Sequence, residues 1–107
     1  MTLEEKLESF KRDRVGFHAS SREVAELLGE TLDRIGIHGN AGSTAHDAVM
    51  LAWEDHGEDT WISVNISWFR GTFCSGSRGY SGHHLKEIYE VTVEELEEYL
   101  GRAGENI

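Results

Sequence analysis

Apolar residues recur at intervals of three and four positions in four stretches of the chain, the spacing of one face of an α-helix. Thr2 and Glu5 precede the first stretch, and this three-residue spacing is typical of a capping box at a helix N-terminus. The predicted helices end near residues 13, 36, 57 and 101, where glycines follow the last three apolar stretches. Similar cap-forming pairs precede those three stretches: Ser20 with Glu23, Thr44 with Asp47, and Thr92 with Glu95.

The second helix has the clearest pattern. Its apolar side chains fall on one side, and most of its acidic side chains fall on the other. Gly36 follows at the position where a left-handed residue commonly ends a helix. The residues predicted to face the core are Val24, Leu27, Leu28, Thr31, Leu32 and Ile35.

Over residues 60–69 the apolar residues recur at every second position, which predicts a β-strand. Ile62 and Val64 lie on its core face, and Trp61 lies on the polar face, where we expect it to be partly exposed. A second strand is predicted over residues 84–91, after a Gly/Ser-rich stretch at 74–82. Two strands alone are marginally stable, so we expect a short third strand near residues 14–18 or 70–74.

These elements predict an α+β fold in a single acidic domain spanning residues 1–107. About four helices are expected to pack on one face of a small antiparallel sheet. A hairpin around residues 60–70 and 84–91 would form that sheet. No internal repeat and no domain linker is found in the sequence.

The charge is strongly unbalanced, with 10 Lys and Arg against 20 Asp and Glu and a net charge of −10. Such a field repels free nucleic acid and membrane surfaces and favours basic partners. Cys74 is the single cysteine, so no intrachain disulfide can form, as is typical of a reducing compartment. No secretory signal and no apolar run of about 18 residues is found, and we expect a cytoplasmic protein.

Acidic residues are concentrated near the last predicted helix. One interpretation is a solvated helix face. The other is a partner-binding surface that imitates the phosphate spacing of nucleic acid and occupies a basic groove on another protein. The residues assigned to this surface are Glu87, Glu90, Glu94, Glu95, Glu97 and Glu98.

Residues 60–86 contain no Asp or Glu, in contrast with the rest of the chain. Glycines at 76, 79 and 82 could turn backbone N–H groups toward an anion, although a long flexible hairpin connection explains them without a ligand and is the favoured interpretation. Strands also disfavour acidic residues, which explains the charge pattern without a ligand. The candidate anion-binding residues are Arg70, Arg78, His83, His84 and Lys86.

The histidine spacing does not indicate a metal site. His46 and His56 are ten positions apart on one predicted helix, about 15 Å along its axis. Cys74 with His83 or His84 could form a nucleophilic pair, but a lone cysteine beside a strand is more often a small buried apolar residue. We therefore assign no catalytic residue, metal or cofactor, and the sequence favours binding over enzymatic activity.

The sequence favours a small acidic protein-binding module, an inhibitor or accessory protein of the kind found in phages and bacterial immunity systems. It would occupy a basic, nucleic-acid-binding surface of a partner protein, without binding nucleic acid or membranes itself. The alternative is a domain that binds phosphate or a nucleotide at the glycine-rich loop of residues 76–82. A homodimer formed through an exposed strand edge near Trp61 is also considered.

Overall fold

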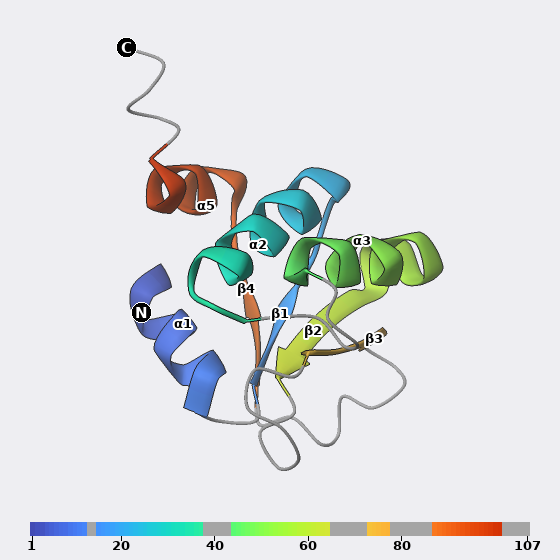
Figure 1. The fold of residues 1–107 in the computed structure, drawn as a ribbon, viewed down its shortest axis with the longest axis horizontal. Coiled ribbons are helices and arrows are strands. Elements are labelled where there is room, and N and C mark those ends of the chain that lie inside the picture. The colour runs from blue at the N-terminus through green and yellow to red at the C-terminus, as the bar shows by residue number, and fades with distance from the viewer. Residues whose placement is uncertain (13–14, 38–43, 65–72, 78–86, 102–107) are drawn as a thin grey trace.

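The computed structural model describes residues 1–12, 15–37, 44–64, 73–77 and 87–101. Within these ranges, helices and strands are mixed along the chain, in agreement with the predicted α+β class (Figure 1). The elements in order are α1 (Leu3–Arg12), β1 (Val15–His18), α2 (Arg22–Arg34), α3 (Ala45–His56), the 3-10 turn η2 (Gly57–Asp59), β2 (Thr60–Val64), β3 (Phe73–Ser77), β4 (Glu87–Glu90) and α5 (Val93–Leu100).

The predicted helix caps are confirmed at three of four positions. Thr2 and Thr92 each accept a hydrogen bond from the backbone N–H three residues later, and Thr44 does the same at the start of α3. The second helix begins one residue later than predicted, because the N-cap is Ser21 rather than Ser20. The α2 residues predicted to face the core are buried, apart from Ile35, which is partly buried.

The strands form a mixed sheet in the order β3-β2-β1-β4. β2 runs antiparallel to β1 and to β3, whereas β4 runs parallel to β1. The predicted hairpin between residues 60–70 and 84–91 is therefore wrong, and so is a fully antiparallel sheet. β1 separates β2 from β4, and β3 is the hairpin partner of β2. A strand at Val15–His18 lies within the first region proposed for a short third strand, and the strand at Phe73–Ser77 overlaps the second region at residues 73 and 74.

One face of the sheet carries the apolar core. Phe17 lies opposite Ile62 on β2 and opposite Tyr89 on β4, so these side chains share a face. The Phe10 ring of α1 packs on Phe17 with 4.9 Å between centroids. The Thr60 hydroxyl of the same face donates to the Ala52 carbonyl of α3 at 3.2 Å. These contacts place α1 and α3 on this face, while the one-face packing of all the helices stays a prediction.

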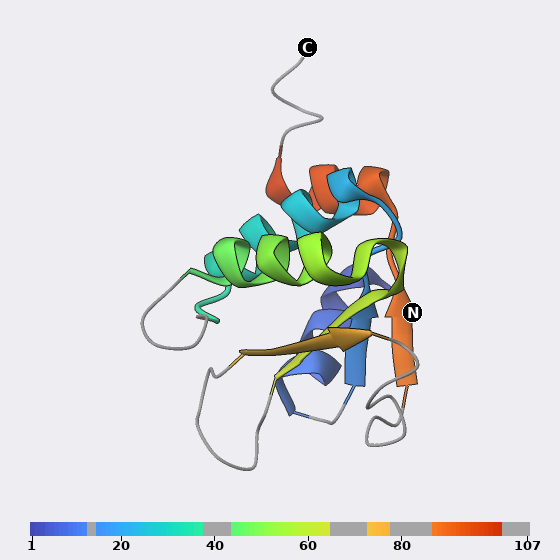
Figure 2. The ribbon, with the colours of Figure 1, turned by 90° about the vertical axis from the view of Figure 1, so that its right-hand side faces the viewer.

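The helices α2, α3 and α5 form one group in both views, with α2 between the other two (Figures 1 and 2). Helices α2 and α3 approach closely at Gly29, where an added Cβ would lie 2.6 Å from the His46 Cα. Asp33 then caps the N-terminus of α3. Its carboxylate oxygens accept from the N–H groups of Ala45, at 2.7 Å, and His46, at 3.2 Å. Backbone proximity and this cap fix the two helices relative to each other.

Trp61 lies on the face opposite Ile62, next to His18 of β1. The prediction that it is partly exposed is wrong, since only 4% of its surface is accessible, and Ser63 on the same face is also buried. The indole Nε1 has no hydrogen-bond acceptor in the described part of the chain. The alternating pattern separated the two faces correctly but could not show that the polar face is covered too.

Candidate protein-binding surface

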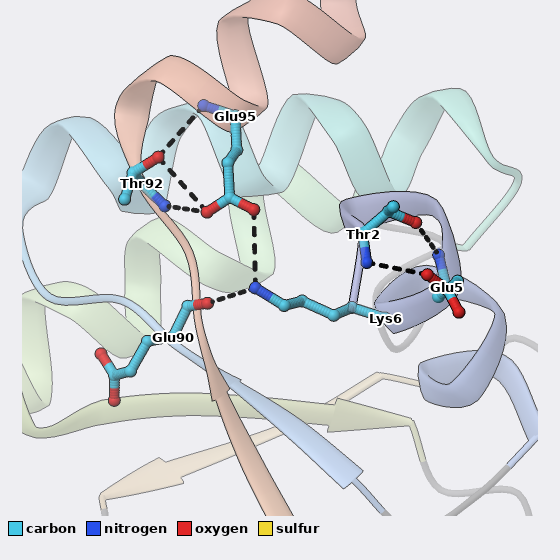
Figure 3. Close-up of polar contacts among 6 residues, drawn as sticks. All are labelled: Thr2, Glu5, Lys6, Glu90, Thr92 and Glu95. Atoms are coloured by element: carbon cyan, nitrogen blue, oxygen red, sulfur yellow. Dashed lines mark hydrogen bonds and ion pairs between the residues drawn. The ribbon is translucent and has the colours of Figure 1, made fainter.

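Lys6 connects the first helix, α1, with β4 and α5 (Figure 3). Its ammonium donates to the Glu90 carbonyl oxygen at 2.9 Å and lies 3.5 Å from Oε2 of Glu95. The side chain is largely buried, with 16% of its surface exposed. A cation held by two acceptors in this setting positions α1 against the junction between β4 and α5.

Two capping boxes fix the helix ends beside Lys6 (Figure 3). At the start of α5, Glu95 Oε1 accepts from the Thr92 N–H at 3.0 Å, while the Thr92 hydroxyl accepts from the Glu95 N–H at 3.1 Å. At the start of α1, Glu5 accepts from the Thr2 N–H at 2.9 Å. This backbone hydrogen bond, followed by the bond with the Thr2 hydroxyl, holds the pKa of Glu5 below its ordinary value.

Two of the remaining acids of α5 are more open to solvent than Glu95. Glu94 and Glu98 are exposed, and Glu97 is half-buried. Glu94 and Glu98 are four positions apart and therefore lie on one side of the helix. Glu95 belongs to the same predicted set, but its carboxylate is engaged by Thr92 and Lys6 within the protein. The set thus divides into carboxylates that position the helix and carboxylates that a partner could reach.

A groove lies where α1 meets α5. One hollow of about 420 Å³ is lined by Leu3 and Glu4 of α1 together with Glu95, Glu98 and Tyr99 of α5. A second hollow of about 330 Å³ shares Glu4 and Tyr99 with the first. We call these two hollows the α1–α5 groove. The full lining of the second hollow of this groove, the one of about 330 Å³, is Glu4, Leu7, Glu8, Lys11, Ile35 and Tyr99.

Glu4 and Glu8 line the candidate groove and were missed by the sequence interpretation. Both are exposed, and they are one helical turn apart on α1. Glu8 forms long, exposed ion pairs of 3.8 Å with Lys11 and Arg12, which contribute little to stability. Their spacing was visible in the sequence, but nothing local indicated that α1 would lie beside α5.

The predicted acids on β4 have different surroundings. Glu87 is exposed at the start of the strand. Glu90, at its end, lies with Oε1 2.7 Å from Nδ1 of His18 on β1. The other ring nitrogen of His18 is 2.6 Å from the backbone carbonyl oxygen of Glu58. Glu90 therefore contributes to the positioning of the strands as well as to the acidic surface.

The candidate anion-binding residues Arg70, Arg78, His83, His84 and Lys86 lie outside the described residues. The same holds for residues 78–82 of the glycine-rich loop, so anion binding stays a prediction. Cys74 belongs to β3, with its Cα opposite that of Ser63. Its side chain lies outside the described part of the structure.

Within the described ranges, no three His, Cys, Asp or Glu side chains are grouped so that they could hold a metal ion. None of the helices described here is long and apolar enough to cross a membrane. Comparisons with protein-family models, with curated proteins and with solved structures found no match to this chain. The surface chemistry is therefore the basis for a functional conclusion.

Proposed function

We propose that this protein is a small acidic protein-binding module that occupies a basic, nucleic-acid-binding surface of a partner protein. The observation that carries the proposal is the α1–α5 groove, where Glu4 from one end of the chain and Glu98 from the other line a single hollow. A net charge of −10 by itself could be explained by a need for solubility. In the groove, carboxylates from distant segments of the chain lie next to apolar lining residues. This arrangement offers a partner both charge and contact area.

The groove would bind a partner through two kinds of contact. Glu4, Glu8 and Glu98 present carboxylates to Lys or Arg side chains, which increases the association rate and makes it depend on salt. Tyr99 is half-buried and offers an amphipathic ring of the type enriched at binding hot spots. The capping boxes and Lys6 hold both helices in place, so little ordering is needed on binding.

A basic surface complementary to this groove is typical of proteins that bind phosphate backbones. By covering such a surface, the protein would act as an inhibitor or accessory factor, in the manner of phage or bacterial proteins that imitate nucleic acid. The proposal places it in the cytoplasm, where such partners meet nucleic acid. A homodimer stays a separate prediction. Trp61 cannot serve as its exposed contact residue, because that side chain is buried.

The experiment is affinity capture from the native host at low and high salt, using the wild type and the double variant Glu4→Gln/Glu98→Gln. The matched control is Glu54→Gln/Asp55→Asn, which removes the same charge from exposed positions of α3. The expected result is a basic partner that is retained by the wild type and the control, and is lost from the groove variant. Excess duplex DNA or RNA should release that partner. Equal capture by both double variants would overturn the assignment of the groove.

A further inference from the structure

Both ring nitrogens of His18 face hydrogen-bond acceptors. Nδ1 lies 2.7 Å from the carboxylate of Glu90, and Nε2 lies 2.6 Å from the backbone carbonyl oxygen of Glu58. The side chain is largely buried, with 13% of its surface exposed. The ring therefore lies between β4, on one side, and the turn η2 that follows α3, on the other.

The chemistry of these acceptors restricts the state of the ring. An ionised carboxylate and a peptide carbonyl both accept hydrogen bonds and cannot donate them. Neutral imidazole carries one N–H, so it satisfies one of the contacts and turns a lone pair toward the other acceptor. Imidazolium carries an N–H on each nitrogen and satisfies both. The observed geometry is thus complete for the doubly protonated ring.

We propose that His18 is a pH-sensitive clamp that ties the end of β4 to the turn after α3. With the proton present, the ring donates to Glu90 and to Glu58 at the same time. When the ring loses that proton, one of the two contacts is lost. The clamp is therefore complete while the ring carries both protons and Glu90 is ionised, and it weakens when a rise in pH removes one ring proton.

The groups around the ring are consistent with this assignment. Glu90 of β4 supplies the carboxylate, and Trp61 of β2, the cross-strand neighbour of His18, is uncharged. Glu58 supplies its backbone carbonyl, and its own side chain is exposed. Lys6 binds the carbonyl oxygen of Glu90, and Figure 3 shows the Glu90 side chain pointing away from Lys6.

Loosening the clamp affects the acidic surface because Glu90 lies two residues before the Thr92 cap of α5. Loss of the ring proton also removes the positive charge that His18 places beside the Glu90 carboxylate. A rise in pH is thus expected to add negative charge beside α5 while loosening the strand that leads into it. The clamp itself does not depend on the proposed function, since protein stability reports it without any partner.

The test combines nuclear magnetic resonance with thermal unfolding over pH 5.5 to 8.5. Long-range proton–nitrogen spectra of the wild type should show both His18 nitrogens protonated at the acidic end. The Tm advantage of the wild type over His18→Gln and over Glu90→Gln should be several degrees there and should shrink toward the alkaline end. The control is His56→Gln, because His56 is exposed at the end of α3. Its Tm difference from the wild type should stay constant with pH.

Two results would overturn the clamp. One is a ring with a single N–H throughout the pH range. The other is a Tm difference between the wild type and Glu90→Gln that does not change with pH. If His18→Gln fails to fold, the wild-type spectra and the Glu90→Gln series still decide the question.

Discussion

Lys6 of α1 and Glu95 of α5 form an ion pair, with 3.5 Å between Nζ and Oε2, although they are 89 positions apart in the chain. The same ammonium binds the Glu90 carbonyl oxygen. The pair therefore connects the first helix with the last strand and the last helix. It also fixes the spacing of the two helices that form the α1–α5 groove.

Replacing Lys6 with Met should destabilise the protein by about 1–2 kcal/mol, because Glu90 loses a charged donor and Glu95 loses its cation in a partly buried site. Chemical denaturation measures this free energy of unfolding. The matched control is Lys11→Met, since the side chain of Lys11 is 41% exposed and its ion pair with Glu8 is 3.8 Å long. That variant should change stability by less than about 0.5 kcal/mol. Equal effects of both substitutions would show that Lys6 does not hold the helices together.

Gly29→Ala should destabilise the protein by about 1–3 kcal/mol, even though Ala is favoured over Gly within a helix. The reason is that the new Cβ would lie 2.6 Å from the His46 backbone, so α2 and α3 would have to separate. Thermal unfolding compares this variant with Glu26→Ala, an exposed position of the same helix. A stabilised Gly29→Ala protein would contradict the close approach of α2 and α3.

The lowered pKa of Glu5 predicts a pH-dependent contribution to stability. Hydrogen bonds from Thr2 favour the ionised carboxylate in the folded state, so the contribution is present above the ordinary value of 4.5 and is lost as the pH falls through the lowered pKa. Glu5→Gln should therefore be less stable than the wild type at pH 7, and the difference should disappear in acid. In a Thr2→Ala background, which removes the hydroxyl but keeps the backbone N–H, the pH-dependent effect of the same substitution should be smaller. Parallel stability curves for wild type and Glu5→Gln would contradict this account.

Trp61→Ala should cost about 3–5 kcal/mol, as expected when a large buried aromatic side chain is removed. Leu51 provides the comparison, because it is a large apolar residue that is 63% exposed on α3. Leu51→Ala should change the free energy of unfolding by less than about 0.5 kcal/mol. A small effect at Trp61 would mean that the second face of the sheet is open in solution.

The helices could be predicted from the sequence because their signals are local. Thr2 with Glu5 and Thr92 with Glu95 mark helix starts within three residues, and the structure contains both capping boxes. The single shift, from Ser20 to Ser21, reflects two adjacent serines that are equally suited to the cap.

The sheet could not be predicted to the same extent, because strand order depends on contacts between distant segments. β1 has four residues, too few for a clear alternating pattern, yet it separates β2 from β4. The candidate surface was predicted in part for the same reason. The acids of α5 stand out in the sequence, whereas Glu4 joins them only because α1 folds back beside α5.

The parallel pairing of β1 with β4 has a consequence for how the protein is made. Val15 of β1 pairs with Glu87 of β4, which lies far along the chain. β1 therefore lacks one of its two flanking strands until residue 87 has left the ribosome. During synthesis the nascent chain can form α1, α2 and α3, but this edge of β1 stays open until β4 has been translated. We expect this pairing to form late in folding and to slow it, because the two strands are far apart in the sequence.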